Sequence, residues 1–264
     1  MISFRCPVCF AALKQNGHSL RCEKGHTFDL ARSGYVNLIR SQKKNHGDDP
    51  EMVRARSRFL DAGYYQPLKR QLIQMIRARQ PRSLLDSGCG EGYYTELCES
   101  LPQCDCLGVD LSRQALKTAC RRCPHVRFAA ASVFALPLPS DCLDLIWSCF
   151  APLALDENAR VLRHQGELIV IGPGRDHLMG LKEILYSSPY PNPPAIFDHP
   201  RFQIVDTAQL RYDIHLEGAQ AIHDLFMMTP YYYKTSLQDK QKLLQRTSLS
   251  TPVHFQFTVL KKQD

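Results

Sequence analysis

A glycine-rich turn is the part of the sequence whose residue types point most directly to chemistry. The stretch Ser83-Leu84-Leu85 predicts a buried strand, and Gly88, Gly90 and Gly92 follow it in close succession. Glycine has no Cβ, so a ligand can lie directly against the backbone of such a turn. Asp110 ends a second apolar stretch about 20 residues downstream, where a carboxylate can accept hydrogen bonds from both ribose hydroxyls. The pattern predicts a site for a cofactor that contains a nucleoside.

The spacing of the turn excludes two common phosphate-binding motifs. It reads Gly-x-Gly-x-Gly, not the Gly-x-Gly-x-x-Gly of dinucleotide sites, and no Lys-Ser/Thr pair follows it as in a P-loop. Asp86 precedes the turn and Glu91 lies inside it, and two carboxylates would repel a pyrophosphate. They suit a cofactor with a cationic end, such as S-adenosylmethionine (SAM), which carries a sulfonium and an ammonium. An ordinary glycine turn of an α/β sheet is the alternative, but strand, turn, helix, strand and acid all come in the expected order.

Four residues near the N-terminus have the spacing of a structural zinc site. Cys6 and Cys9 form one pair, and Cys22 and His26 follow after twelve intervening residues. Two such pairs joined by a short hairpin hold Zn²⁺ tetrahedrally, and three thiolates with one imidazole leave no position open for a catalytic water. His18 is an alternative fourth ligand. It ranks below His26 because it lies in the middle of the hairpin.

Length and composition set broad limits. A chain of 264 residues supports one main core and a small appendage. It shows no basic start followed by an apolar run, and its longest nearly apolar run, Leu143 to Leu155, is too short for a bilayer. The eleven cysteines then favour a reducing compartment, with free thiols or metal in place of disulfides. We expect a cytoplasmic protein without a membrane partner.

Charge is distributed unevenly along the chain. Residues 1–82 contain 16 Lys and Arg against 6 Asp and Glu, whereas residues 83–264 contain 17 against 20. A basic first third beside a nearly neutral remainder is typical of a module that binds a polyanion, although a basic soluble surface is the alternative. The candidate phosphate contacts are Lys43, Lys44, Arg54, Arg56 and Arg58.

Hydrophobic patterning divides the chain into a zinc-binding module over 1–36, a basic linker with two helices over 37–80, and an α/β domain over 81–264. Strands that alternate with short helices favour a parallel sheet. Strands are expected near 83–87, 105–109, 126–130, 143–148, 167–171, 202–216 and 253–260. Helices are expected near 50–62, 66–79, 93–101, 112–122, 156–163, 176–186, 218–228 and 236–246.

These segments together resemble one family, the bacterial large-subunit ribosomal RNA guanine-N1-methyltransferases. The likeness covers most of the chain. Its most specific motifs are Gly34-Tyr35-Val36-Asn37-Leu38 and Gly63-Tyr64-Tyr65-Gln66-Pro67-Leu68, which are more specific than the glycine turn that many methyltransferases share. Further motifs are Pro173-Gly174 before His177 and Met228-Thr229-Pro230. The resemblance implies a Rossmann-like class I methyltransferase with a mainly parallel seven-stranded sheet and a small N-terminal zinc-binding module.

The resemblance also implies cofactors, target and site residues. The cofactors are SAM and Zn²⁺, and the target is N1 of a guanine in a hairpin loop of 23S ribosomal RNA. The family is often described as dimeric. The implied zinc ligands are Cys6, Cys9, Cys22 and His26, and the implied SAM contacts are Tyr65, Gly90, Glu91 and His177. The chain departs from the family at Ser87, where an Ile is usual, and near Ser132, which we expect at the adenine although the usual acidic residue is missing there.

The expected chemistry is an in-line methyl transfer in which the protein positions the reactants and excludes water. Guanine N1 must lose a proton, yet the sequence identifies no general base. His177 is a candidate on pKa grounds, but contact with the carboxylate of the cofactor is the preferred interpretation. Phe150, just after a predicted strand, either stacks on an extruded guanine or packs in the core. Tyr65 either closes over the cofactor as part of a lid or packs half-buried.

Two other functions fit parts of the pattern. One is a class I methyltransferase that acts on a small metabolite and carries a purely structural zinc module. The other is a zinc-dependent nucleic-acid-binding regulator whose methyltransferase fold has lost activity. The basic first third argues against the former, and the intact acidic and glycine residues of the turn argue against the latter.

Overall fold

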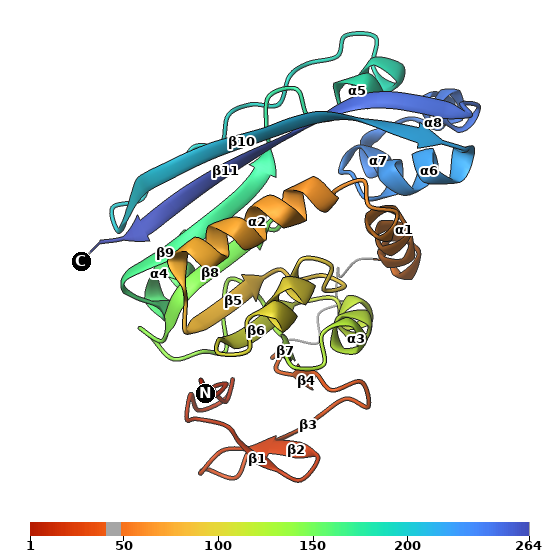
Figure 1. The fold of residues 1–264 in the computed structure, drawn as a ribbon. Coiled ribbons are helices and arrows are strands. Elements are labelled where there is room, and N and C mark those ends of the chain that lie inside the picture. The colour runs from red at the N-terminus through yellow and green to blue at the C-terminus, as the bar shows by residue number, and fades with distance from the viewer. Residues whose placement is uncertain (41–48, 264) are drawn as a thin grey trace.

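An eight-stranded sheet forms the centre of the molecule, in the order β10-β11-β9-β8-β5-β6-β7-β4 (Figure 1). The structure is a computed structural model and describes residues 1–40 and 49–263. Strands β4 to β9 run parallel to one another, and β11 is antiparallel to both of its neighbours. The strands are β4 (Val36–Asn37), β5 (Ser83–Ser87), β6 (Asp105–Asp110), β7 (Arg127–Ala130), β8 (Leu143–Cys149), β9 (Leu162–Pro173), β10 (Phe202–Glu217) and β11 (Ser248–Lys262).

The expected class I fold is confirmed, and the expected strand number is one too low. The additional strand is β4, which pairs in parallel with β7 through Val36 opposite Ala129 and Asn37 opposite Ala130. A strand of two residues is too short to show the alternation by which strands are recognised in a sequence. Because β4 follows the zinc-binding segment directly, the family-specific motif around Val36 joins that segment to the edge of the sheet.

Apart from a short helix over residues 231–234, which the sequence did not predict, the helices lie where expected, with local differences. They are α1 (Pro50–Asp61), α2 (Gln66–Arg79), α3 (Arg113–Arg122), α4 (Leu155–Val161), α5 (Met179–Leu185), α6 (Ala219–Met227), α7 (Tyr231–Lys234) and α8 (Leu237–Leu244). The helix expected over 93–101 is instead a 3₁₀ helix, η1 (Thr95–Ser100). Strand β9 begins five residues earlier than expected, directly after α4. At the start of α1, the side chain of Asp49 accepts a hydrogen bond from the Glu51 amide.

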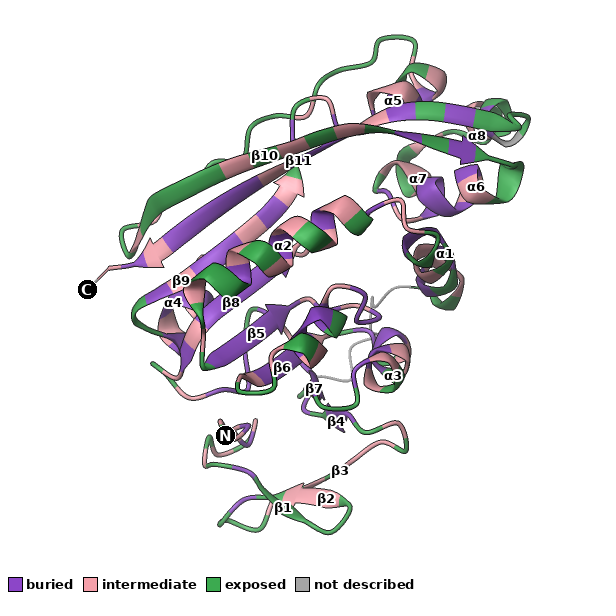
Figure 2. Cartoon of the chain, viewed as in Figure 1, coloured by how far each residue is buried: buried purple, intermediate pink, exposed green. Residues whose placement is uncertain are grey.

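The two faces of the sheet are covered differently. Helices α1, α2, α3, α5 and α6 contribute to a core on one face, which includes Phe59, Leu72, Leu116 and Leu225. Figure 2 shows the buried side of α2 turned toward the strands. This helical layer buries several aromatic side chains, among them Trp147 and Phe255, and fixes the position of α1 above the sheet.

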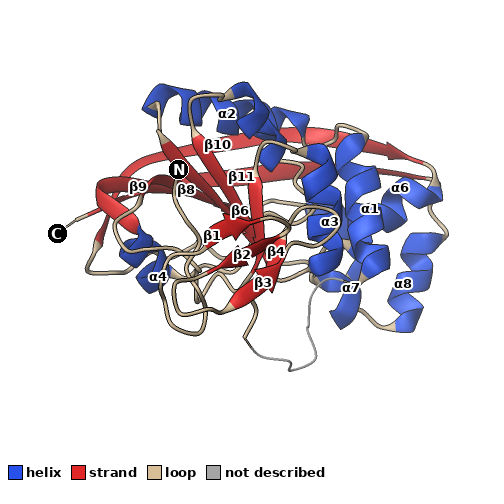
Figure 3. Ribbon diagram, turned by 90° about the horizontal axis from the view of Figure 1, so that it is seen from below, coloured by secondary structure: helices blue, strands red, loops and turns tan. Residues whose placement is uncertain are grey.

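The second face is covered by α4 and by the N-terminal segment. This segment contains a three-stranded antiparallel sheet of β1 (Lys14–Asn16), β2 (Ser19–Arg21) and β3 (Thr27–Asp29). The small sheet lies below β6 and β7 in Figure 1 and in front of the large sheet when the molecule is seen from below (Figure 3). Phe4, Leu13 and Cys22 share a core with Leu107 of the large sheet. Backbone contacts reinforce the packing, since the Arg5 amide donates to the Pro137 carbonyl at 2.8 Å.

Within the described residues, no helix combines the length and the apolar character that a membrane span requires.

Candidate cofactor and metal sites

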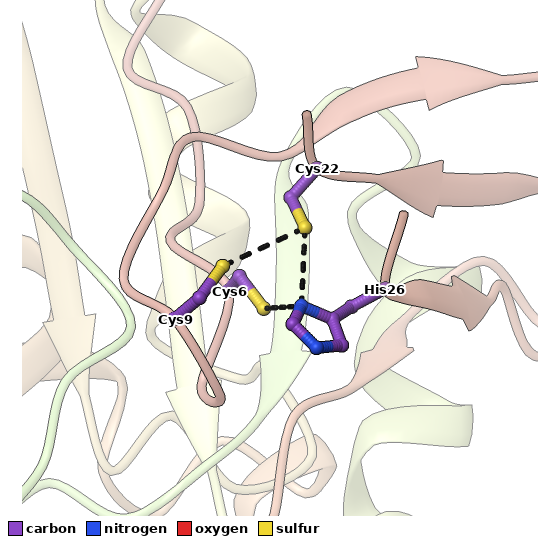
Figure 4. Close-up of side chains that lie close together, drawn as sticks. All are labelled: Cys6, Cys9, Cys22 and His26. Carbon is purple, nitrogen blue, oxygen red and sulfur yellow. Dashed lines mark hydrogen bonds between the residues drawn. The ribbon is translucent and has the colours of Figure 1, made fainter. Parts of the chain in front are cut away.

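Three thiols and one imidazole converge at the N-terminal segment (Figure 4). The Sγ atoms of Cys6, Cys9 and Cys22 and a ring nitrogen of His26 all lie within 4.8 Å of one another. Cys6 Sγ is 3.5 Å and Cys22 Sγ is 3.3 Å from His26 Nδ1, and Cys9 Sγ is 3.6 Å from Cys22 Sγ. Ligands at about 2.0–2.3 Å from a tetrahedral zinc ion are about 3.3–3.8 Å apart. The four residues therefore fit Zn²⁺ in a closed structural site.

Local backbone geometry places these ligands. The Phe10 amide donates to the Cys6 carbonyl at 2.8 Å, which closes the first turn. The Gly25 amide donates to the Cys22 carbonyl at 3.0 Å, and the φ angle of Gly25 is +85°, a conformation that favours glycine. His18 lies in the hairpin between β1 and β2 and is not part of the cluster found among the described residues. The structure therefore favours His26 over His18 as the fourth ligand.

The glycine turn lies at the carboxyl end of β5, beside the point where the strand order reverses. Chain order runs outward from β5 through β6 and β7, and then returns to the other side of β5 with β8. Ligands of open α/β sheets bind at such a position. Gly88, Gly90 and Gly92 have φ angles of +85°, +53° and +82°, which side chains other than glycine rarely adopt. The glycine turn therefore lies at the position where α/β sheets of this topology bind their cofactors.

The side-chain-free positions of the turn face protein neighbours. A Cβ on Gly88 would lie 2.4 Å from the Cβ of Ala151, and one on Gly92 would lie 2.9 Å from the Cα of Ala119 in α3. A Cβ on Gly90 would lie 3.1 Å from Nη2 of Arg56. Close packing of the turn therefore explains these glycines, in addition to the approach of a ligand that we expected from the sequence.

Asp110 ends β6 and lies beside the turn. Its Oδ2 accepts a hydrogen bond from the Gly90 amide at 2.8 Å, and its Oδ1 accepts one from the Ser112 amide at 2.7 Å. These contacts orient the carboxylate, and a carboxylate can accept about four hydrogen bonds in total. The geometry suits the predicted contact between Asp110 and a ribose.

Asp86 is buried under the turn. Its Oδ2 accepts a hydrogen bond from the hydroxyl of Thr95 at 2.6 Å. Burial raises the pKa of Asp86 to about 7, and the neighbouring carboxylates of Asp110 and Glu91 also raise it. Desolvation and like charges both disfavour an anion, so a cation at this place would favour the charged form of Asp86.

The three arginines of α1, predicted to bind phosphates, have different surroundings. Arg56 donates from Nε to Oε2 of the buried Glu91 at 2.6 Å. Arg58 donates to both carboxylate oxygens of the buried Asp224, at 2.8 and 2.7 Å. Arg54 is 58% exposed and pairs with Glu51 one turn earlier. Lys43 and Lys44 lie outside the described residues. Two of the three α1 arginines are thus bound to buried carboxylates.

An aromatic cluster follows the ends of β8 and β9. Tyr65 is buried and packs edge-on against Phe255, with ring centroids 4.9 Å apart. Its hydroxyl lies 3.4 Å from Nε2 of the buried His177. Phe150 lies against the same imidazole, with centroids 5.5 Å apart, and remains 46% exposed. The structure therefore brings together Tyr65, His177 and Phe150, which are distant in the sequence.

His177 is held as a neutral imidazole. Burial lowers its pKa to about 3. Its Nδ1 accepts a hydrogen bond from the His254 amide at 3.2 Å, so the proton of the neutral ring resides on Nε2 and points to the oxygen of Tyr65. A group with so low a pKa is a poor base at neutral pH. This geometry favours the contact role of His177 over that of a general base.

The segment from Ser132 to Phe134 was expected at the adenine from the sequence, but Leu111, a second exposed apolar side chain near the same edge, was missed. Leu111 follows β6 and is 42% exposed, and Phe134 follows β7 and is 61% exposed. Ser132 lies between β7 and Phe134 and accepts a hydrogen bond from the Phe134 amide at 3.2 Å. An apolar residue directly after the acid that ends β6 was the available signal, because such a side chain is poised to cover a base.

Comparisons with known proteins match both parts of the chain. A family described as "RlmA, N-terminal" matches residues 4–46, and one described as "Methyltransferase domain" matches residues 84–166. A malonyl-[acyl-carrier protein] O-methyltransferase of Herminiimonas arsenicoxydans is 31% identical but covers 41% of this chain and 44% of its own length. That likeness does not extend over the whole chain.

Two longer matches each cover more than nine tenths of the chain. A 23S rRNA (guanine(748)-N(1))-methyltransferase of Streptomyces fradiae is 34% identical over 95% of this chain and 91% of its own length. A Bacillus subtilis (strain 168) protein, provisionally named as a 23S rRNA (guanine-N1)-methyltransferase, is 34% identical over 91% of this chain and 90% of its own length. The chain belongs to the family of the 23S ribosomal RNA guanine-N1-methyltransferases.

Proposed function

We propose that this protein transfers a methyl group from SAM to N1 of a guanine in a hairpin loop of 23S ribosomal RNA. The observation that carries the proposal is the extent of the likeness to the Streptomyces fradiae protein, which covers 95% of the chain, together with the family match over residues 4–46, which contain the four zinc ligands. The malonyl-[acyl-carrier protein] O-methyltransferase is similar over only 41% of the chain. We take the zinc-binding segment as the feature that separates the RNA enzyme from the alternative.

The residues around the turn suit SAM. Asp110 would hold the ribose, Gly90 and Glu91 would contact the methionine end, and Asp86 would stabilise the cationic groups. Ser132, Leu111 and Phe134 would surround the adenine. When bound, SAM supplies an activated methyl group on its sulfonium, so the protein has only to orient the reactants and exclude water.

The aromatic cluster suits an extruded guanine. Phe150 is exposed on one side and rests on His177 on the other, so it offers a flat face for a base. Its φ angle of +54° lies in the left-handed region, outside the extended conformation of β8. Because His177 donates from Nε2 toward Tyr65, the hydroxyl hydrogen of Tyr65 is available to donate to a ligand acceptor. No general base is assigned, and the N1 proton is expected to leave to water.

We place the RNA-binding surface on the zinc-binding segment and on helix α3 instead of on α1. The zinc-binding segment exposes Lys14, Arg21 and Lys24, for which the described part of the chain provides no ion-pair partner. Helix α3, which lies beside this segment in Figure 3, exposes Arg113, Lys117 and Arg121 at intervals of four residues. Residues four apart lie on one face of a helix, about 6 Å apart along its axis. Together these six cations would bind a phosphate backbone and make the affinity salt-dependent.

Two further features belong to the proposal. The resemblance favours a homodimer, which sedimentation equilibrium of the purified protein would test. A 23S ribosomal RNA substrate also implies that the protein works in the cytoplasm, where bacterial ribosomes assemble.

The test is methyl transfer from labelled SAM to 23S rRNA and to its isolated hairpins. We expect label in RNA, and mass mapping should locate it at N1 of one guanine, which also blocks reverse transcription at that base. A transcript with adenine at this position should stay unlabelled. Label in small metabolites but not in RNA would support the metabolite enzyme. Absence of SAM binding would support the inactive regulator.

A further inference from the structure

Arg56 of α1 lies directly against the glycine turn. Its guanidinium uses Nε to bind Oε2 of Glu91 at 2.6 Å, and the Glu91 side chain is only 3% exposed. Another edge of the same guanidinium faces the turn, because Nη2 is the atom nearest to the Cβ position of Gly90, at 3.1 Å. A planar guanidinium presents donors on several edges at once. One edge of Arg56 is therefore fixed by the turn while a second is directed at its backbone.

The negative charge around the turn would be balanced by a cation such as Arg56. Asp86, Glu91 and Asp110 place three carboxylates there, and the Asp86 carboxyl is influenced by both of the others. They suit the ammonium and sulfonium of SAM but would repel its α-carboxylate. His177 does not offset them, since burial keeps it neutral. Arg56 is a cation in contact with the turn, since it binds Glu91 and lies beside Gly90.

Helix α1 is also firmly placed. Ala55 and Phe59, on either side of Arg56 along the helix, are almost completely buried. Two residues after Arg56, Arg58 binds Asp224 of α6 through two hydrogen bonds. A guanidinium held in this way loses little conformational freedom when a ligand arrives, which favours affinity.

We propose that Arg56 recognises the α-carboxylate of the cofactor, so that it serves the cofactor site instead of the RNA. This inference rests on the proposed use of SAM. Glu91 orients the guanidinium through Nε, and the edge facing Gly90 binds the carboxylate. The ammonium of the same amino-acid end is left to Asp86 and its neighbours, so the turn separates the two charges of a zwitterion.

The rival explanation is that Arg56 only stabilises the turn through Glu91. A structural role would affect every ligand of the turn alike, whereas recognition of a carboxylate affects only ligands that carry one. Decarboxylated S-adenosylmethionine keeps the sulfonium, the ammonium and the nucleoside and lacks only this group. Comparing it with SAM therefore separates the two roles.

The experiment is calorimetric titration of the wild type and of Arg56→Met with both ligands. The wild type should bind SAM about 10- to 100-fold more tightly than the decarboxylated compound, as expected for one charge-assisted contact. Arg56→Met should lose most of this preference while binding the decarboxylated compound almost as the wild type does. Arg54→Met, on the exposed side of the same helix, is the matched control and should keep the full preference.

Each outcome decides between the roles. Equal loss of affinity for both ligands in Arg56→Met would assign Arg56 a structural role and overturn the proposal. Equal binding of the two ligands by the wild type would overturn it without any variant, even if Arg56→Met failed to fold. If the wild type bound neither ligand, the proposed function itself would fail. Arg56→Lys should show an intermediate preference, because one ammonium cannot hold Glu91 and a carboxylate in the same planar geometry.

Discussion

The zinc cluster and the glycine turn are assembled in opposite ways. The four zinc ligands lie within 21 consecutive residues and are positioned by tight local turns. The groups around the glycine turn come from α1, from β5 and β6, and from the segments that follow β7, β8 and β9. The first site is a property of a short peptide with its metal. The second exists only once the large sheet has formed.

The two sites are also stabilised by different interactions, the zinc cluster by its metal and the glycine turn by packing. Strand β1 is fully exposed, and the small N-terminal sheet has few buried side chains of its own, so the metal must supply much of its order. Strand β5 is buried at every residue, and the turn that follows it is fixed by packing. Removing the metal should therefore disrupt one site and leave the other intact.

The largest expected effect is on the zinc cluster. Cys22→Ser should release the metal, because a structural zinc site contributes roughly 10 kcal/mol of binding free energy that depends on its thiolates. Zinc content, measured by atomic absorption, should fall from one ion per chain to almost none, and rRNA methylation should be reduced. SAM affinity should stay at the wild-type value. Full retention of zinc would refute the ligand set, and loss of SAM binding would show that the two sites are not independent.

The next effect concerns the glycine turn alone. Asp110→Ala removes the carboxylate proposed to hold the ribose, along with its hydrogen bonds to the Gly90 and Ser112 amides. SAM affinity should fall about 100-fold or more, the equivalent of two hydrogen bonds to a charged group. Zinc content and RNA affinity should not change. Calorimetry that showed wild-type SAM affinity would remove Asp110 from the site.

Sequence reasoning succeeded where the signal is local or repeated. The zinc ligands follow from spacing, and the large sheet follows from apolar stretches separated by helices. Strand β4 was not predicted, because two residues are too few to show the alternation of buried and exposed positions. The 3₁₀ conformation of residues 95–100 was also not predicted. Strand β4 is defined by its pairing with β7, and this long-range contact cannot be deduced from a two-residue pattern.

The arginines of α1 show what helical geometry adds to such reasoning. Residues two apart on a helix point in nearly opposite directions, so Arg54, Arg56 and Arg58 cannot share one RNA-facing surface. Arg56 in fact faces the turn, and Arg58 reaches a carboxylate 166 residues away in the sequence. Helical spacing in the sequence could have predicted that Arg56 points away from Arg54 and Arg58. It could not have predicted the partners, Glu91 for Arg56 and Asp224 for Arg58.

A smaller effect is expected on the pH dependence of stability, and it comes from Asp86, which is buried under the turn. Burial raises the pKa of Asp86 to about 7, above the ordinary value near 4, so the folded protein retains a proton that the unfolded chain releases between those values. The free energy of unfolding should therefore decrease as the pH rises from about 4 to about 7, by at most about 1.4 kcal/mol per pH unit from this group. Urea unfolding at several pH values measures it.

Asp86→Asn should remove this part of the slope. Asp141→Asn is the matched control, because a hydrogen bond from Lys262 lowers the pKa of that carboxyl and takes it out of the pH range of interest. Saturating SAM should flatten the slope of the wild type, since a cation favours the charged form of Asp86. A slope that is unchanged in Asp86→Asn would show that this carboxyl is ionised throughout the range.

The smallest expected effect tests the surface of the zinc-binding segment. Replacing Lys14, Arg21 and Lys24 together by Gln should weaken RNA binding at low salt and lower the slope of log affinity against log salt by about 1 for each phosphate that the protein no longer neutralises. The matched control replaces Arg70, Arg77 and Arg82, three exposed cations on or next to α2, which lies on the opposite face of the sheet (Figure 1). Filter binding to a 23S hairpin at several salt concentrations gives both slopes. Equal decreases in affinity in the two triple variants would mean that RNA responds to net charge alone, and the zinc-binding segment would then have no special part in recognising its substrate.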